Sequence, residues 1–110
     1  MSRYSLSAII GAVLAAVAMT HAPDAVAADG KAIYEKSCIV CHSAGVAGAP
    51  KLDDKENWKD RIAQGMDTLH LHAIKGFTGK KGMMPPKGGA MALSDDEVKA
   101  AVDYMVSEAK

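Results

Sequence analysis

"CIVCH", residues 38–42, contains the only two cysteines of a 110-residue chain, and a histidine follows the second of them directly. Three kinds of site use two cysteines at this spacing: a redox-active dithiol, part of a zinc site, and the covalent attachment site of a haem. The rest of the sequence distinguishes between these three chemistries.

The beginning of the chain has the pattern of a secretory signal peptide. Arg3 is followed by an apolar run over residues 6–19 and by the small-x-small tripeptide "AVA" at residues 25–27. The alternative is a retained membrane anchor, but the run is shorter than the roughly 18 to 20 apolar residues of a spanning helix. We therefore expect residues 1–27 to be cleaved, and residues 28–110 to form one soluble periplasmic domain without stable membrane insertion.

Composition limits what this domain can be. It would contain one tryptophan and one phenylalanine, and hence a small apolar core. A domain of this size usually needs a disulfide, a metal or a large bound cofactor for stability. The chain has 13 basic and 13 acidic residues, and this balance does not suggest a nucleic-acid partner.

Local signals predict an all-α fold of three to four or more short helices. Asp29 can cap a helix from residue 30 to about residue 37, so the cysteines would lie where this helix ends. A second helix would run from about residue 55 to Gln64, with Gly65 as its stop, and Asp67 can cap a third that reaches about residue 76. No segment alternates apolar and polar residues as a half-buried strand does.

The last helix has a complete start signal. Ser94 and Glu97 have the spacing of a capping box, and Leu93 and Val98 that of a hydrophobic staple. An apolar stripe of Val98, Ala101, Val102 and Met105 follows. Before this helix, residues 76–92 contain seven Gly or Pro positions, which predict a long loop without a continuous helix or a central strand.

The three chemistries need different surroundings. A dithiol oxidoreductase normally lies on a βαβ framework, and the sequence predicts no strands. Zinc would need further ligands, but His70 and His72 are two apart on a predicted helix and point to nearly opposite sides. C-x-x-C-H in an exported chain favours the third chemistry, in which Cys38 and Cys41 bind one haem c covalently and His42 ligates its iron. The broad apolar haem also explains the small core.

The opposite face of the iron needs a ligand if the site is to be closed. Candidates are Met66, Met83, Met84, Met91, Met105, His70 and His72. The 76–92 loop is long and irregular enough to cross that face, and Met84 precedes Pro85-Pro86, whose fixed φ angles favour an extended backbone. We assign Met84. Met83 remains the alternative, because adjacent residues of an extended segment point to opposite sides. His70 and His72 are expected to be exposed helix residues, and Met66 and Met105 apolar packing.

In these segments the sequence resembles the class I c-type cytochromes, most closely the small bacterial cytochrome c5 group. The resemblance covers residues 28–110: the matching segments are "CIVCH", "GVAGAP" at 45–50, "MPPKGG" at 84–89 and "LSDDEVKAAVDYM" at 93–105.

The resemblance implies several contacts. Gly30 would permit a close crossing of the first and last helices, and Tyr34 would pack near Tyr104. The Pro50 carbonyl would accept a hydrogen bond from His42 Nδ1, which leaves Nε2 for the iron.

On the second predicted helix, Trp58 and Arg61 resemble positions near the haem propionates, although Trp58 is equally consistent with an ordinary core residue. Many members of the group also have a second cysteine pair near the start of the last helix. This chain lacks that pair.

The resulting functional interpretation is an electron carrier rather than an enzyme, cycling between Fe(II) and Fe(III) with donor and acceptor proteins. The alternatives are a haem subunit of a larger oxidoreductase complex, or an open-site haem enzyme or gas sensor. A group of lysines without neighbouring acids is the candidate docking surface for a redox partner. It consists of Lys75, Lys80, Lys81 and Lys87.

Overall fold

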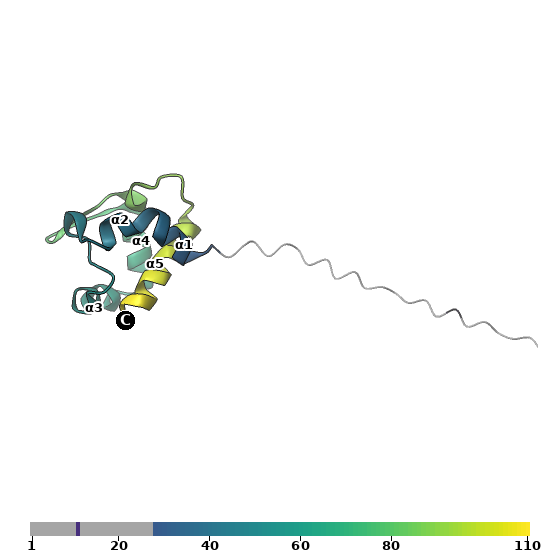
Figure 1. The fold of residues 1–110 in the computed structure, drawn as a ribbon, viewed down its shortest axis with the longest axis horizontal. Coiled ribbons are helices and arrows are strands. Elements are labelled where there is room, and N and C mark those ends of the chain that lie inside the picture. Colours follow the sequence, from purple (N-terminus) through teal and green to yellow (C-terminus); the bar gives the residue numbers. More distant parts are fainter. Residues whose placement is uncertain (1–10, 12–27) are drawn as a thin grey trace, which may run out of the picture.

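The computed structural model describes Gly11 and residues 28–110 (Figure 1). Apart from Gly11, the predicted signal peptide therefore lies outside the described residues. No helix in the described part of the chain is both long enough and apolar enough to cross a bilayer.

Residues 28–110 are mainly helical. In chain order the elements are α1 (Gly30–Ile33), a π-helical turn (Tyr34–Cys38), α2 (Ile39–His42), a 3₁₀ turn (Val46–Gly48), α3 (Lys55–Ala63), α4 (Met66–Lys75), β1 (Phe77–Gly79), β2 (Gly82–Met84), a 3₁₀ turn (Pro86–Gly89) and α5 (Asp95–Ala109).

The first helix is longer than its predicted end near residue 37. α1, the π-helical turn and α2 follow one another without a gap, so the helical segment passes through the whole of "CIVCH" and ends at His42. Asp29 caps its start, because its side chain accepts a hydrogen bond from the Ala32 amide.

The two middle helices lie close to their predicted positions, and one of them has a different N-cap. α3 begins and ends within one residue of its expected bounds. α4, by contrast, begins at Met66, with Gly65 as its N-cap and no side-chain cap hydrogen bond. The predicted cap at Asp67 is therefore wrong; its carboxylate lies in the first turn, where it complements the helix dipole.

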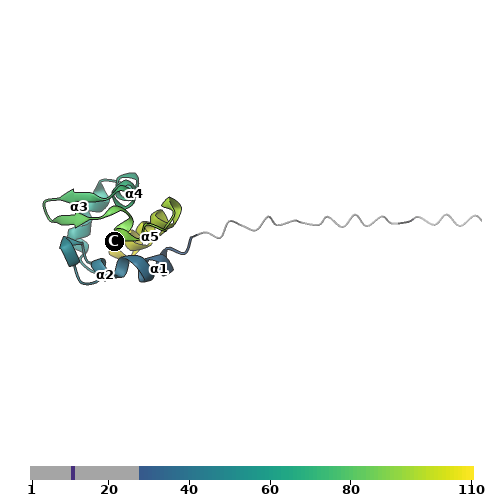
Figure 2. The ribbon, with the colours of Figure 1, turned by 90° about the horizontal axis from the view of Figure 1, so that it is seen from above.

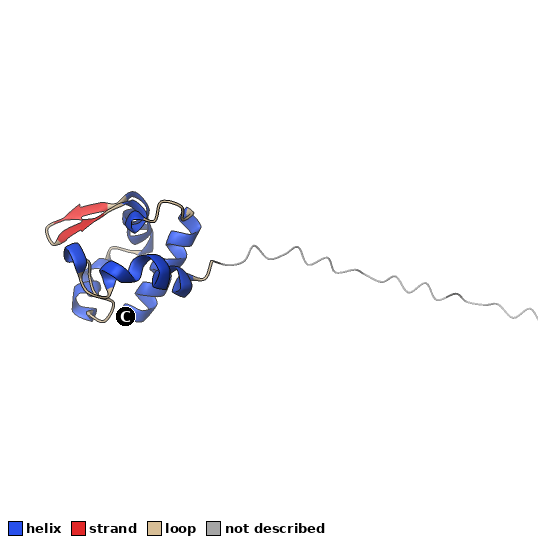
Figure 3. Ribbon diagram, turned by 45° about the horizontal axis from the view of Figure 1, so that its top comes forward, coloured by secondary structure: helices blue, strands red, loops and turns tan. Residues whose placement is uncertain are grey.

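The 76–92 segment is more ordered than the predicted loop. β1 and β2 form an antiparallel hairpin in which Phe77 pairs with Met84 and Thr78 with Met83 (Figure 3). The fold is thus helical apart from this hairpin. The expected absence of strands is wrong at this place, because strands of three residues are too short to show alternation.

The hairpin turn rests against the loop that follows the motif. A Cβ at Gly48 would overlap the Lys81 carbonyl, and a Cβ at Gly82 would overlap the Ala47 carbonyl. Both glycines have positive φ. Only glycine permits two backbones to approach this closely in this conformation.

α5 provides most of the core. Its capping box is confirmed: the Ser94 side chain accepts from the Glu97 amide, and the Glu97 carboxylate accepts from the Ser94 amide. The hydrogen bond from the Ser94 amide lowers the pKa of the Glu97 carboxyl. The predicted stripe is buried, together with other residues of the same helix: Val98, Ala101, Val102, Met105, Val106 and Ala109.

The crossing of α1 and α5 is the one that the family resemblance implies. A Cβ at Gly30 would overlap the carbonyl oxygen of Ala100. One turn further on, the rings of Tyr34 and Tyr104 lie 5.5 Å apart between centroids. α1 and α5, the first and last helices of the domain, therefore cross so closely that no side chain fits at position 30.

We expect Gly30→Ala to destabilise the protein by about 1–3 kcal/mol, the usual cost of inserting a methylene into a packed contact. This sign is opposite to the gain of up to about 1 kcal/mol that Gly→Ala gives in an unhindered helix. Denaturant unfolding of the two proteins measures the difference. Lys31→Ala, on the exposed neighbouring position, is the control and should change the free energy of unfolding by less than about 0.5 kcal/mol. A Gly30→Ala protein as stable as the parent would contradict the close crossing.

Candidate haem-binding site

A cavity of about 430 Å³ lies between the motif helix and the hairpin. Figure 2 shows α1 and α2 on one side of the domain, with the hairpin and α4 on the other. Cys38, Cys41 and His42 line the first wall, and Met84 with the hairpin lines the second. The volume is within the usual range of cofactor sites, roughly 300–1,000 Å³.

Helical geometry places the three motif residues on one wall. Side chains three and four positions apart lie on the same face of a helix, so Cys38 is beside both Cys41 and His42. Both thiols are free and half-buried. Burial raises the pKa of the Cys38 thiol, and the neighbouring Cys41 raises it further. This wall therefore presents two adjacent thiols next to an imidazole.

His42 is held in one orientation. Its side chain is buried, with 8% of the residue surface exposed. Its Nδ1 lies 2.9 Å from the Pro50 carbonyl, which can only accept, so Nδ1 donates and Nε2 is left without the proton. Burial lowers the pKa of His42; the hydrogen bond to Pro50 opposes this shift, and Arg61 reinforces it. The neutral imidazole with a free Nε2 is the form that ligates a metal.

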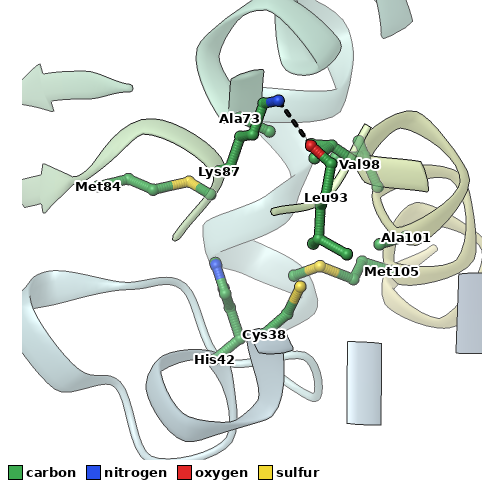
Figure 4. Close-up of a pocket in the computed structure, with 10 residues that line it drawn as sticks. Cys38, His42, Ala73, Met84, Lys87, Leu93, Val98, Ala101 and Met105 are labelled. Carbon is green, nitrogen blue, oxygen red and sulfur yellow. Dashed lines mark hydrogen bonds between the residues drawn. The ribbon is translucent and has the colours of Figure 1, made fainter. Parts of the chain in front are cut away.

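Met84 enters the cavity from the opposite wall. It lies at the end of β2, is half-buried and packs against the hydrophobic core. Figure 4 shows the Met84 side chain and the His42 ring nitrogen directed into the same space from different segments. Met83 also borders the cavity, but 58% of its surface is exposed.

The two candidate histidines have different environments. His70 Nε2 lies 2.6 Å from Asp103 Oδ1, which joins α4 to α5, and His70 does not border the cavity. His72 borders it and stacks on Phe77 with 4.3 Å between ring centroids. The expectation that His72 is a simple exposed residue is therefore wrong. Its spacing from Leu69, which also borders the cavity, is the helical signal that identifies the buried face.

Trp58 and Arg61 border the cavity from α3. Trp58 is also part of the core, and its Nε1 donates to the Lys51 carbonyl at 2.8 Å. Trp58 is therefore a core residue that also borders the cavity, and its position near the haem propionates stays a prediction. Phe77, the single phenylalanine, also borders the cavity, which the sequence analysis did not identify.

The four candidate docking lysines do not form one group. Lys80 and Lys81 are exposed in the hairpin turn and border the cavity. Lys75 is exposed at the end of α4. Lys87 is half-buried, and its ammonium donates to the Leu93 carbonyl. The Lys87 ammonium therefore makes its contact within the protein.

The residues present fit a haem and do not fit a zinc ion. No group of three or more His, Cys, Asp or Glu side chains within residues 28–110 could hold a metal ion. The cavity instead combines a mostly apolar lining, two adjacent thiols and a buried imidazole with a free Nε2. These are the features that a covalently attached macrocycle with an axial ligand requires.

Comparison with known proteins also indicates a protein with a covalently attached haem. The family model described as Cytochrome c matches residues 27–108. The chain is 51% identical to cytochrome c-555 of Chlorobaculum tepidum over 110 residues, which is the whole of both chains. It is 43% identical to cytochrome c5 of Ectopseudomonas mendocina over 75 residues, covering 66% of this chain and 82% of the relative.

Two solved structures have the same fold. A cytochrome c in an electron-transfer complex with nitrite reductase matches with a TM-score of 0.66 and 43% identity, over 74% of this chain and 95% of its own. A mono-haem ferrocytochrome c from Shewanella putrefaciens matches with a TM-score of 0.58 and 43% identity, over 70% and 90%.

This chain belongs to the cytochrome c family. It therefore binds a single covalently attached haem c and is an electron-transfer protein rather than an enzyme.

Proposed function

We propose that residues 28–110 form a periplasmic electron carrier with a closed, low-spin haem ligated by His42 and Met84. Cys38 and Cys41 would form the two thioether bonds. One observation supports this proposal above the others: His42 Nε2 and the Met84 side chain enter one apolar cavity from opposite walls. An open-site enzyme or sensor would leave the second face of the iron to solvent.

When bound, the haem iron supplies a one-electron Fe(II)/Fe(III) couple. The chain's own contribution is to keep the two ligands in place. Pro50 fixes His42 through Nδ1 and makes the imidazole a better donor. Met84 is supported by its packing against the core. Ligands that do not move between redox states suit rapid transfer, and a thioether ligand with an apolar lining favours a high potential.

The optical spectrum of the purified oxidised holoprotein tests this proposal. We expect a low-spin spectrum with the long-wavelength charge-transfer band of methionine-ligated ferric haem. The reduced protein should not bind carbon monoxide, because both axial positions are filled. A high-spin oxidised spectrum or rapid carbon monoxide binding would instead support the open-site alternative.

The partners are proposed to be redox proteins that approach the cavity edge at the hairpin turn. Lys80 and Lys81 are exposed there, with Lys75 nearby along the chain. The nitrite reductase complex of a structural neighbour supports a redox enzyme as the class of partner. A partner with an acidic surface would be attracted to these lysines.

We expect Lys80→Ala with Lys81→Ala to slow oxidation of the reduced protein by ferricyanide severalfold at low salt, because two positive charges near the cavity edge attract the anion. Stopped-flow rates measure this effect, which should shrink as ionic strength rises. Oxidation by a cationic cobalt complex is the control and should not slow. Equal ferricyanide rates in the variant and the parent would leave these lysines without a role in docking.

A further inference from the structure

Lys87 has an unusual backbone conformation for a residue with a side chain. It follows Met84 by three positions and has φ 54° and ψ 26°, in the left-handed region. Gly88 has a similar conformation with φ 62°. A residue with a Cβ is uncommon in this region, which glycine adopts without cost. The contacts of the Lys87 side chain offset this disadvantage.

The Lys87 ammonium spans from the 3₁₀ turn to the start of α5. Its Nζ donates to the Leu93 carbonyl at 2.6 Å and lies 3.4 Å from Asp95 Oδ1. Figure 4 shows the hydrogen bond to Leu93 directly above Met105 and Cys38. The Lys87 side chain is only 18% exposed. A charge-assisted hydrogen bond in such a position is among the stronger single contacts of a small domain.

This contact links the two ends of the segment that connects Met84 to α5. Residues 85–94 follow Met84 directly, and the chain has no second cysteine pair that would hold them by a disulfide. The Lys87 side chain lines a small apolar pocket together with Met84, Cys38 and His42. The Lys87 side chain therefore lies on the pocket side of the segment that follows Met84.

We infer that Lys87 is a positioning residue for the Met84 ligand: its ammonium fastens residues 85–94 to the start of α5 and so keeps the Met84 sulfur in the cavity. This inference rests on the proposed ligation by Met84. It separates Lys87 from Lys80 and Lys81, which are exposed in the hairpin turn.

Imidazole binding to the oxidised holoprotein measures how readily Met84 leaves the iron, because imidazole can bind only when the sixth position is free. In the parent, the hydrogen bond from the charged Lys87 side chain stabilises the form in which Met84 occupies the cavity. Lys87→Ala lacks this bond, so we expect its imidazole association constant to be about tenfold or more higher. Lys87→Arg keeps a donor and a charge and should stay within about threefold of the parent. Lys99→Ala removes an equal charge from an exposed position of α5 and is the matched control.

The free energy of unfolding must be measured for each variant. The change in the free energy of imidazole binding is then compared with the change in the free energy of unfolding. If the binding change is no larger than the unfolding change, the inference is overturned, because Lys87 would then act on the whole fold. An unchanged association constant in Lys87→Ala would also overturn it. Where Lys87→Ala does not fold, Lys87→Gly removes the same contact and relieves the backbone conformation.

The parent spectrum separates this inference from the proposed function. A parent without the methionine band would overturn both. A parent that has the band, together with a Lys87→Ala protein that binds imidazole as the parent does, would overturn the role of Lys87 alone.

Discussion

Met84→Ala should open the sixth coordination position of the iron. The oxidised protein is expected to lose the methionine charge-transfer band and to become high-spin or solvent-ligated, and the reduced protein should bind carbon monoxide. The reduction potential should fall by on the order of 0.1 V, within the roughly 0.8 V range that axial ligands control. Optical spectroscopy and a redox titration measure both effects.

Met83→Ala is the matched control for this substitution. The two methionines are adjacent in β2, but Met83 is mostly exposed whereas Met84 packs against the core. We expect Met83→Ala to keep the methionine band. If the band disappears in Met83→Ala and survives in Met84→Ala, the ligand is the neighbouring residue and the carrier function stands. If it survives in both, another methionine at the cavity, Met105 first, must be tested. A closed, low-spin site that lacks the band in Met84→Ala would instead point to His72.

Cys38→Ala with Cys41→Ala should abolish covalent haem attachment. Acid-acetone extraction is expected to leave the pigment on the parent polypeptide and to remove nearly all of it from the double variant. The cavity of about 430 Å³ would then lose its permanent occupant. We expect the free energy of unfolding to fall by on the order of 5 kcal/mol, which is comparable to the whole stability of a small domain.

The single variants refine this prediction. Either thiol alone can still form one thioether bond, so Cys38→Ala and Cys41→Ala should each keep part of the pigment. Ser37→Ala, at a neighbouring position on the cavity wall, is the control and should retain all of it. A double variant that folds with unchanged stability, or a parent whose pigment extracts into the solvent, would contradict covalent attachment at these residues.

Local features of this protein are predictable from the sequence because their causes lie within a few residues. Ser94 and Glu97 exchange hydrogen bonds across three positions, and the buried stripe of α5 follows from helical periodicity. The side-by-side arrangement of Cys38, Cys41 and His42 has the same origin, since spacing on one helix determines which residues share a face.

The family resemblance extended this to three contacts between separate segments, one of which is the packing of Tyr34 near Tyr104. The sequence alone offers Gly30 only as a residue at a helix start, and Pro50 only as a loop residue. Their contacts with Ala100 and His42 are present in the structure. Each joins segments whose distance in space does not follow from local pattern, which is why the residues by themselves did not predict them.

What the sequence by itself determined is the c-type attachment motif, the predominantly helical fold and the cap of the last helix. Only the tertiary structure decided that His72 faces the cavity, that residues 77–84 form a hairpin, and that Lys87 points inward rather than toward a partner. The physical reason is that each of these features depends on a neighbour supplied by another segment. The hairpin turn stays in place through the backbone contacts of Gly48 and Gly82, and Lys87 is oriented by a carbonyl and a carboxylate that become its neighbours only when the chain folds around the cavity.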